Sequence, residues 1–372
     1  MDKPLFFASI ILCIIGLVMV FSSSSVSAVL RYETSPYHFF TRQLLFMIMT
    51  FILGIGLIIK IPIKKYKKIY SLIFICVVGM LGLLIIYGSI INGAKSWFAL
   101  GPITVQPSEF AKTAIILYLA CFFDINVKSD KRFYYVRPLI ASLVVVFLVF
   151  KQPDLGTAAI IGILVYMLFM VVPYNKKDTD VKWFKLAGTS LIVLVALLMM
   201  FGGNLLNSEQ TDRLTYKNPC DRYIEKTGYQ VCNGMIAINN GGLFGVGLGG
   251  STQKYMYLPD DHTDFIFPII VEELGSIFGA IIILLYLFIV FRLLKISKNA
   301  KNLAGSMIAY GTACMFILHL LINLGGILAL IPMTGVPLPL LSYGGSVTIN
   351  TLILIFLSLR VSIEGNMAKA EE

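Results

Sequence analysis

Titratable side chains gather in one short stretch of the sequence, LPDDHTDFIFPIIVEELG at residues 258–275. Three aspartates and a histidine stand directly before an apolar run, and Glu272 and Glu273 follow about two helical turns after the last aspartate. A positioned carboxylate can accept a proton from a hydroxyl group as a general base. Several carboxylates that lie close together can instead hold a divalent cation. This stretch is therefore the first candidate for a site of chemistry.

Asp264 is the last of these aspartates and lies beside the apolar run. The side chain of Asp264 or Thr263 is suited to cap the N-terminus of a following helix, and Pro268 fits a first helical turn. A capping carboxylate is stabilised in its charged form, which makes it a weaker base. From the residues alone, a capping role and a proton-accepting role both stay open for Asp264, and the two could alternate.

Other ionisable residues interrupt apolar sequence elsewhere. Glu109 and Lys112 stand three positions apart, so they share one face of a helix. Lys151 and Asp154 enclose a short polar turn, KQPD. Because ionisable groups in hydrocarbon are costly, such residues mark a pathway or a site by default. For Glu109 and Lys112, a structural ion pair that joins helices is the alternative.

The elements that must position these residues are membrane helices. The chain of 372 residues is 58% hydrophobic and only 13% charged, so lipid must be the solvent for most of it. Backbone polar groups in hydrocarbon need internal partners, which leaves helices as the expected element. We predict an all-α integral membrane protein, a single polytopic domain over 1–372 with about ten transmembrane helices. The expected spans are 5–29, 42–60, 69–92, 106–123, 137–150, 155–173, 183–203, 265–291, 303–331 and 339–359.

The placement of charge predicts how the spans are oriented. A net charge of +10 could suggest a nucleic-acid partner, but the lysines and arginines gather in alternate loops. These loops lie at 60–68, 128–137, 176–185 and 292–301. Short basic loops face the cytoplasm, so we predict that both termini are cytoplasmic and that nucleic acid is not a partner.

The largest polar segment, residues 204–263, is then an extracytoplasmic loop between the seventh and eighth spans. Its glycine-rich stretch at 239–250 lets the backbone approach a ligand or a helix closely, and it lacks the context of a phosphate-binding P-loop. Cys220 and Cys232 share this loop and could form a disulfide in an oxidising compartment, but the sequence leaves their bonding open. Any chemistry is expected on this outer face.

The stretch NLGGILALIPMTGVPLPLLSYGGS, residues 323–346, interrupts a membrane helix with three prolines and several glycines. Non-helical backbone at membrane depth survives only where protein buries it or where it lines a cavity. We therefore expect a re-entrant or outer turn beside the cavity that contains the site.

Five blocks of the sequence resemble signature blocks of the SEDS family, which includes FtsW, RodA and SpoVE. They are GLVMVFSSSS, GAKSWFALGPITVQPSEFAK, QPDLGTA, the stretch from GYQVCNGMIAINNGG to VEELG, and IPMTGVPLPLLSYGGS. Their order and spacing are similar from the first span to the last, and STQKYMYLP is more similar to the division and sporulation branch than to the elongation branch. Ser96 departs from the pattern, because many relatives carry arginine there.

The resemblance implies a fold and an activity. Family members are ten-span proteins of the bacterial inner membrane that polymerise lipid II, a lipid-linked disaccharide-pentapeptide, into glycan strands with release of polyprenyl pyrophosphate. A class B penicillin-binding protein is the implied transpeptidase partner. Asp264 matches the family's essential aspartate in the outer loop, which favours the proton-accepting role.

The implied reaction assigns roles to the other candidates. A departing pyrophosphate needs positive charge or a metal ion, and Arg213 and Lys254 are the preferred cations. Glu272 or Glu273 is expected to anchor the helix beneath the site. The further expected substrate contacts are Glu109, Lys112, Lys151, Asp154 and His262. No cofactor is required by the spacing, although Mg²⁺ or Mn²⁺ could be held by Asp260, Asp261 and Glu272.

Two other classes of function stay open. The same cavity could flip lipid II across the membrane, since broken helices and buried charges suit transporters too. Alternatively, the chain could be a non-catalytic scaffold that activates a penicillin-binding protein. The concentration of polar residues outside, instead of at the membrane midplane, favours an enzyme.

Overall fold

The fold is seen in a computed structural model that describes residues 1–91, 94–101, 103–126, 135–152, 154–173, 218–224, 226–259 and 261–371. The expected seventh span at 183–203 lies outside these residues, as do Arg213 and Asp260.

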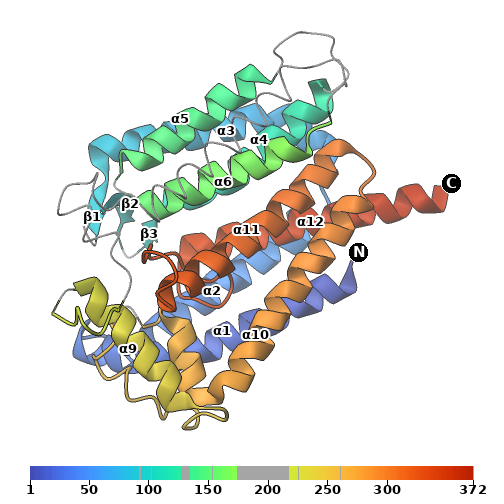
Figure 1. The fold of residues 1–372 in the computed structure, drawn as a ribbon. Helices are drawn as coiled ribbons and strands as arrows, with labels where there is room; N and C mark the ends of the chain where they lie inside the picture. Colours follow the sequence, from blue (N-terminus) through green and yellow to red (C-terminus); the bar gives the residue numbers. More distant parts are fainter. Residues whose placement is uncertain are drawn as a thin grey trace.

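The described chain is almost entirely helical (Figure 1). Its helices are α1 (Lys3–Leu30), α2 (His38–Leu53) with the π-helical turn η1 (Gly54–Ile58), α3 (Ile63–Tyr87), α4 (Pro107–Asn126), α5 (Val136–Phe150), α6 (Leu155–Val171), α9 (Lys226–Gly241), α10 (Ile266–Lys298), α11 (Leu303–Ile327) and α12 (Gly345–Glu371). Among them, six are long and apolar enough to cross a membrane, and α5 and α6 are shorter apolar helices. Every expected span that falls within the described residues overlaps a helix, although 69–92, 303–331 and 339–359 each extend beyond the helix that they match.

Two features of the loops were not expected from the sequence. A small antiparallel sheet, β1 (Ser89–Ile91), β2 (Ala94–Leu100) and β3 (Ile103–Val105), follows α3, with Phe98 opposite Val105. The expected third span, 69–92, includes the residues of β1. A short apolar strand and the end of a membrane helix cannot be distinguished by sequence. The second feature is α9, a helix inside the polar loop 204–263.

The helices form a buried centre with lipid-facing flanks. In the central layer of Figure 1 lie α11 and α12, between α3–α6 on one side and α1 with α10 on the other. In α11 and α12, 72% of the apolar 18-residue stretch of each helix is buried inside the protein. In α2 and α3, the buried share is 22%. Both termini lie at one end of the molecule, and α9 and the sheet lie at the other.

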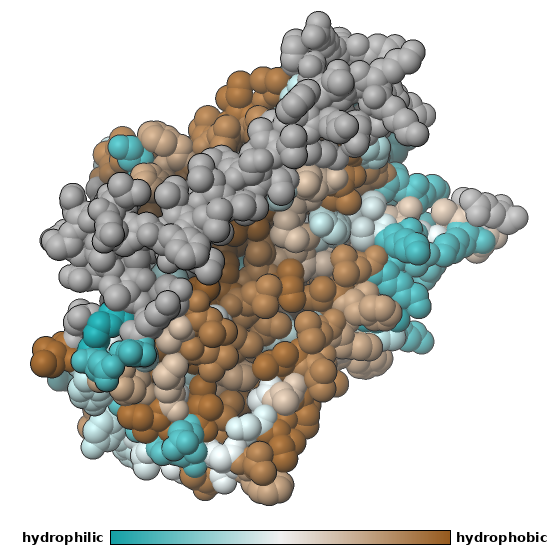
Figure 2. Space-filling view, in the orientation of Figure 1, coloured by the Kyte–Doolittle hydropathy of each residue, from teal (hydrophilic) through white to brown (hydrophobic). Residues whose placement is uncertain are grey.

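The surface agrees with a position across a membrane. Figure 2 shows a broad apolar face over the middle of the molecule, with hydrophilic residues gathered at the end near the termini and around α9. Exposed side chains recur along α10 at helical spacing, as at Ile277, Ile281, Leu284 and Phe291. An apolar stripe of this kind fits contact with lipid acyl chains. The protein is thus a multi-pass membrane protein.

One long helix, α10, is interrupted at Gly275, whose backbone angles are φ 87° and ψ 163°. The interruption frees the carbonyl oxygens of Glu272 and Glu273 from their usual partners in the next turn. The amides of Val246 and Gly247 replace those partners, each with a hydrogen bond of 2.9 Å. The glycine-rich loop after α9 thus caps the first part of α10.

The same loop also caps the second part of α10. The amide of Ser276 donates to Gly242 O at 2.9 Å, and that of Ile277 donates to Leu243 O at 3.3 Å. So close an approach of two backbones leaves no room for side chains. A Cβ atom on Gly245 would lie 2.2 Å from Glu273 O, and one on Gly275 would lie 2.2 Å from Leu243 O. This packing explains why glycine stands at Gly241, Gly245 and Gly275, where a Cβ atom would meet backbone atoms.

Candidate active site

Asp264 lies in the turn before α10, at a small open hollow that we call the Asp264 cavity. The end of α11 and the loop between α11 and α12 form the rest of its wall. The lining residues are Asp264, Phe265, Ile322, Asn323, Gly326, Ile327, Met333, Thr334, Gly335 and Val336. The proline-rich stretch therefore lies beside Asp264, as the sequence suggested. A Cβ atom on Gly335 would lie 3.7 Å from Asp264 Oδ2.

Asn323 fixes the position of Asp264. Its Nδ2 donates to the backbone oxygen of Asp264 at 2.7 Å and to that of Val336 at 2.8 Å, so one amide joins the two walls of the cavity. The other atom of that amide, Oδ1, is buried and has no hydrogen-bond partner among the described residues. A buried acceptor without a partner is unfavourable, so this atom is suited to accept a hydrogen bond from a bound ligand.

The carboxylate of Asp264 is half-buried and accepts a hydrogen bond from Thr263 Oγ1 at 3.0 Å. The N-cap position of α10 belongs to Phe265, and no side chain forms a capping hydrogen bond there. The sequence left capping open for Asp264 and Thr263. In the structure neither residue occupies the N-cap position, and the Asp264 carboxylate lines the cavity.

The loop between α11 and α12, residues 328–344, is held by hydrogen bonds to its proline carbonyls. Tyr286 Oη donates to Pro339 O at 2.6 Å, and His319 Nδ1 lies 2.9 Å from Pro337 O. Since a carbonyl oxygen only accepts, His319 must carry its proton on Nδ1. The other ring nitrogen, Nε2, is left as an acceptor.

His319 Nε2 lies beside the buried Lys112 cation. Lys112 Nζ lies 2.9 Å from His319 Nε2 and 2.8 Å from Glu109 Oε1. All three side chains are at most 3% exposed. The expected ion pair of Glu109 and Lys112 is present, and it has a third member on α11 that the sequence analysis did not single out. Through His319 this group is connected to the loop that lines the Asp264 cavity.

A second, open hollow has Asp261 and His262 of the segment 261–264 in its lining. We call it the Arg31 pocket; it is lined by Ser27, Arg31, Tyr32, Lys254, Met256, Leu258, Pro259, Asp261 and His262. His262 Nδ1 lies 2.9 Å from Asp261 Oδ1, and its ring packs 4.5 Å from the ring of Phe39 and 5.5 Å from that of Tyr343. Burial raises the pKa of the Tyr343 hydroxyl above its ordinary value, and nearby Arg42 opposes that shift.

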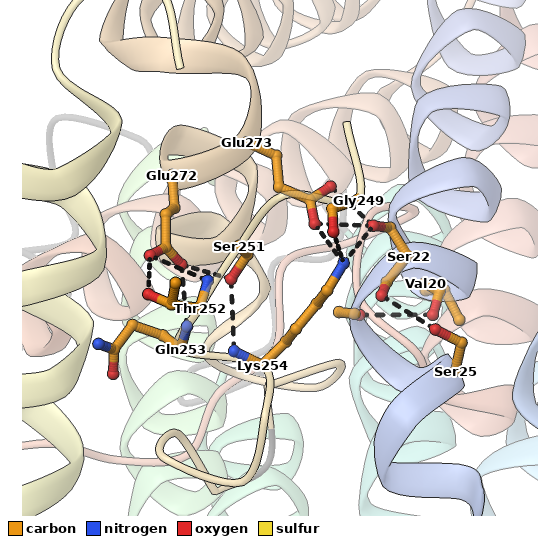
Figure 3. A network of polar contacts seen from close by, with 11 residues as sticks. Val20, Ser22, Ser25, Gly249, Ser251, Thr252, Gln253, Lys254, Glu272 and Glu273 are labelled. Atoms are coloured by element: carbon orange, nitrogen blue, oxygen red, sulfur yellow. Dashed lines mark hydrogen bonds and ion pairs between the residues drawn. The ribbon is translucent and has the colours of Figure 1, made fainter. Parts of the chain in front are cut away.

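Lys254, an expected substrate ligand, has structural partners on three sides (Figure 3). Its Nζ lies 2.8 Å from Glu273 Oε1 and donates to Gly249 O at 2.8 Å and to Ser22 Oγ at 3.4 Å. Ser22 also donates to Glu273. Lys254 and Glu273 are almost fully buried, so this pair joins α1, α10 and the glycine-rich loop.

Glu272 faces a different set of partners, as expected for adjacent helix residues. Its carboxylate accepts hydrogen bonds from Thr252 Oγ1 at 3.0 Å, from Asn240 Nδ2 at 3.2 Å and from Gln253 N at 3.3 Å. Ser251 Oγ donates to it as well. With its oxygens engaged in this way, Glu272 anchors the loop to α10.

No three His, Cys, Asp or Glu side chains come together within the described ranges. Asp261 lies beside His262, and Asp260 is outside those ranges.

The expected contacts at the KQPD turn have local roles. Asp154 is the N-cap of α6 and accepts a hydrogen bond from Thr157 N at 3.0 Å, and Gln106 Nε2 donates to it at 3.1 Å. Lys151 is exposed and lies 5.6 Å from the ring centre of Phe147. Ser96 Oγ donates to Gln152 O at 3.1 Å.

Cys220 and Cys232 are joined by a disulfide, which closes a loop of sequence separation 12 onto α9. The sequence had left this bond open. The other cysteines of the described residues, Cys13, Cys76, Cys121 and Cys314, are free thiols.

The most important residues that sequence reasoning missed are Asn323 and His319. Both stand on α11 four positions apart, so they share a helix face. Polar residues inside an apolar span are the signal that could have found them.

Comparison with known proteins places these features in context. The family described as cell cycle protein, FtsW/RodA/SpoVE, matches residues 3–367. The chain is 37% identical to the probable peptidoglycan glycosyltransferase FtsW of Bacillus subtilis (strain 168), over 100% of this chain and 93% of that protein. It is 35% identical to stage V sporulation protein E of the same organism, over 97% of this chain and 96% of the relative.

Solved structures share the fold. A chain from a study of structural coordination of polymerization and crosslinking by a peptidoglycan synthase complex has a TM-score of 0.77 at 25% identity, covering 98% of both chains. Rod shape determining protein RodA of Thermus thermophilus has a TM-score of 0.68 at 25% identity, covering 98% of this chain and 97% of that one.

Proposed function

This chain belongs to the FtsW, RodA and SpoVE family of cell cycle proteins, and we propose that it is a peptidoglycan glycosyltransferase with Asp264 as its catalytic base. Its substrate in this proposal is lipid II, which it polymerises into glycan strands for cell division or shape maintenance. The observation that carries the assignment is the position of Asp264, whose carboxylate lines a cavity while its backbone is fixed by Asn323.

We propose the following reaction. The 4-hydroxyl of the acceptor sugar enters the Asp264 cavity and loses its proton to the Asp264 carboxylate. The hydroxyl oxygen forms a bond to the anomeric carbon of the donor, while the bond from that carbon to the pyrophosphate oxygen breaks. Polyprenyl pyrophosphate leaves with the electron pair. A single displacement inverts the anomeric configuration, so one base is sufficient and no covalent sugar–enzyme intermediate is needed.

Asn323 assists in this scheme. Its buried Oδ1, which has no partner within the described chain, accepts a hydrogen bond from a hydroxyl of the acceptor sugar. That contact orients the sugar relative to Asp264, and Nδ2 of the same amide fixes the Asp264 backbone. Positioning of this kind lowers the barrier because the reacting atoms are held near their attack geometry.

The scheme includes no step through a divalent cation. Glu272 is one of the three acids expected to hold a cation, and it already accepts hydrogen bonds from Asn240, Thr252 and Gln253. Lys254 is likewise engaged with Glu273, so in this scheme it is not the cation that stabilises the leaving group.

We place the chain in the bacterial plasma membrane with both termini in the cytoplasm and Asp264 on the outer side. The basic residues at the terminal end of the molecule support this orientation, since Lys295 and Lys298 lie in the last turn of α10. A class B penicillin-binding protein is the proposed partner. Support comes from the fold shared with a chain of a peptidoglycan synthase complex.

A reconstituted polymerisation assay tests the proposal. The purified chain in liposomes with lipid II is expected to form glycan polymer, and Asp264→Ala should abolish polymer while the thermal unfolding midpoint stays close to that of the unchanged protein. Translocation of lipid II without polymer would support a transporter instead. Polymer that appears only from an added penicillin-binding protein, undiminished by Asp264→Ala, would support a scaffold.

A further inference from the structure

The segment 261–264 contributes to both hollows, with Asp261 and His262 in the lining of one and Asp264 in the lining of the other. The Asp264 cavity and the Arg31 pocket share no lining residue. His262 lines the Arg31 pocket and Asp264 lines the cavity, and residues two positions apart have Cα atoms within about 7 Å. Groups bound in the two hollows would therefore be neighbours. An enzyme that joins two lipid-linked sugars requires two such places.

Arg31 supplies the available positive charge in the second hollow. The other cation of its lining, Lys254, is already engaged with Glu273, Gly249 and Ser22. Arg31 is exposed, and its guanidinium lies 5.6 Å from the ring centre of Tyr32. Within the described ranges, no carboxylate is paired with it. A guanidinium in this setting can form paired hydrogen bonds with phosphate oxygens.

The position of Arg31 in the membrane matches that of lipid phosphates. It is the C-cap residue of α1, a helix of 28 residues that is long and apolar enough to cross the hydrocarbon. A residue directly beyond such a helix lies at the level of the headgroups. The phosphates of a lipid-linked sugar lie at this level, and the sugar lies further from the hydrocarbon.

The remaining lining residues suit a sugar. Asp261 is a hydrogen-bond acceptor for hydroxyl groups, and its contact with His262 Nδ1 fixes the orientation of that ring. Tyr32 and His262 add ring faces to the wall. A carboxylate repels pyrophosphate. The sugar is therefore expected to bind beside Asp261, and the phosphates beside Arg31.

We propose that the Arg31 pocket is the subsite for the glycosyl pyrophosphate headgroup of the donor lipid, with Arg31 as the ligand of the pyrophosphate. This assignment rests on the proposed glycosyltransferase function. When the bond between the anomeric carbon and the pyrophosphate oxygen breaks, the electron pair leaves with the pyrophosphate, and Arg31 stabilises the added negative charge. The acceptor sugar occupies the Asp264 cavity at the same time.

The test measures binding of farnesyl pyrophosphate, a short soluble analogue, to the full-length protein in nanodiscs by calorimetry. Arg31→Gln is expected to weaken this binding about ten-fold, because charge-assisted hydrogen bonds to phosphate are lost. Farnesol, which has no phosphate, should bind both proteins equally. Lys295→Gln removes the same charge from an exposed position near the other end of α10 and should change neither affinity.

Binding is measured in parallel in the Asp264→Asn background, where no turnover occurs, so that the subsite and the reaction are judged separately. Loss of farnesyl pyrophosphate affinity on Arg31→Gln in that background supports the subsite. If polymer forms normally but Arg31→Gln leaves both this affinity and the KM for lipid II unchanged, the subsite is refuted and the glycosyltransferase stands. If binding depends on Arg31 but the unchanged protein forms no polymer, the glycosyltransferase fails and the donor assignment is overturned with it.

Discussion

Asn323 and Asp264 are joined by a hydrogen bond of 2.7 Å from the Asn323 side-chain amide to the Asp264 backbone oxygen. The same amide nitrogen donates to Val336 O at 2.8 Å. One side chain on α11 thus sets the distance between the turn that carries the carboxylate and the loop that faces it. Among the described residues, no side chain forms a capping hydrogen bond at the N-terminus of α10.

Asn323→Ala removes the hydrogen bonds from Nδ2 to the backbone oxygens of Asp264 and Val336. It also removes Oδ1, which has no hydrogen-bond partner among the described residues. We expect kcat for polymerisation to fall about ten- to a hundred-fold, because the base and the acceptor sugar lose their fixed positions. The free energy of unfolding should fall by about 1–3 kcal/mol, since two backbone oxygens lose a partner. Steady-state kinetics with lipid II and thermal unfolding measure these changes. Unaltered kcat in a folded variant would show that Asn323 has no part in positioning.

Glu109→Gln leaves the buried Lys112 cation without a carboxylate. We expect a loss of about 3–5 kcal/mol in unfolding free energy, because an uncompensated buried charge is strongly unfavourable. The effect on stability should exceed the effect on chemistry. Thermal unfolding in detergent, compared with turnover of the folded fraction, measures both. Normal thermal stability with abolished turnover would contradict this prediction and assign Glu109 to the reaction.

The backbone contact between the glycine-rich loop and α10 gives a matched pair of variants. Gly245 and Gly247 both have positive φ, 80° and 99°, so alanine is strained at either position. A Cβ atom at Gly245 would also lie 2.2 Å from Glu273 O, whereas one at Gly247 would meet nothing within 4 Å. Gly245→Ala should therefore lower the thermal unfolding midpoint clearly more than Gly247→Ala. Equal midpoints would mean that the loop is not seated against α10.

The disulfide between Cys220 and Cys232 should stabilise the segment around α9. Replacing both cysteines by alanine is expected to lower stability by about 3 kcal/mol at most, since the bond restricts a short loop in the unfolded chain. Thermal unfolding with and without reductant measures the change, and the double variant should not respond to reductant. Free thiols at both positions in non-reduced protein, detected by mass spectrometry, would refute the bond.

Much of the fold could be predicted from the sequence, because membrane helices are recognised by their length and apolar composition. The expected spans at 5–29 and 303–331 overlap α1 and α11. The strands β1–β3 and helix α9 could not be predicted in this way. Strands as short as β1 and β3 offer too few residues for a period, and the polar composition of the loop 204–263 masked a helix that packs on α10.

The site could be predicted in part. The apolar context of Asp264 and the prolines of 323–346 were enough to expect a cavity beside an outer turn. Which charges pair with each other was not accessible, because such pairing depends on distance between remote segments. Lys254 and Glu273 stand 19 positions apart, and Lys112 and His319 stand 207 apart, so only the packed helices bring them together.

The interruption of α10 at Gly275 has a mechanical consequence. A continuous helix is held straight by its own backbone hydrogen bonds, but at Gly275 these bonds are interrupted. Both pieces of α10 are hydrogen-bonded instead to the glycine-rich loop, whose Phe244 is 82% exposed. The relative orientation of the two pieces therefore depends on the conformation of this loop.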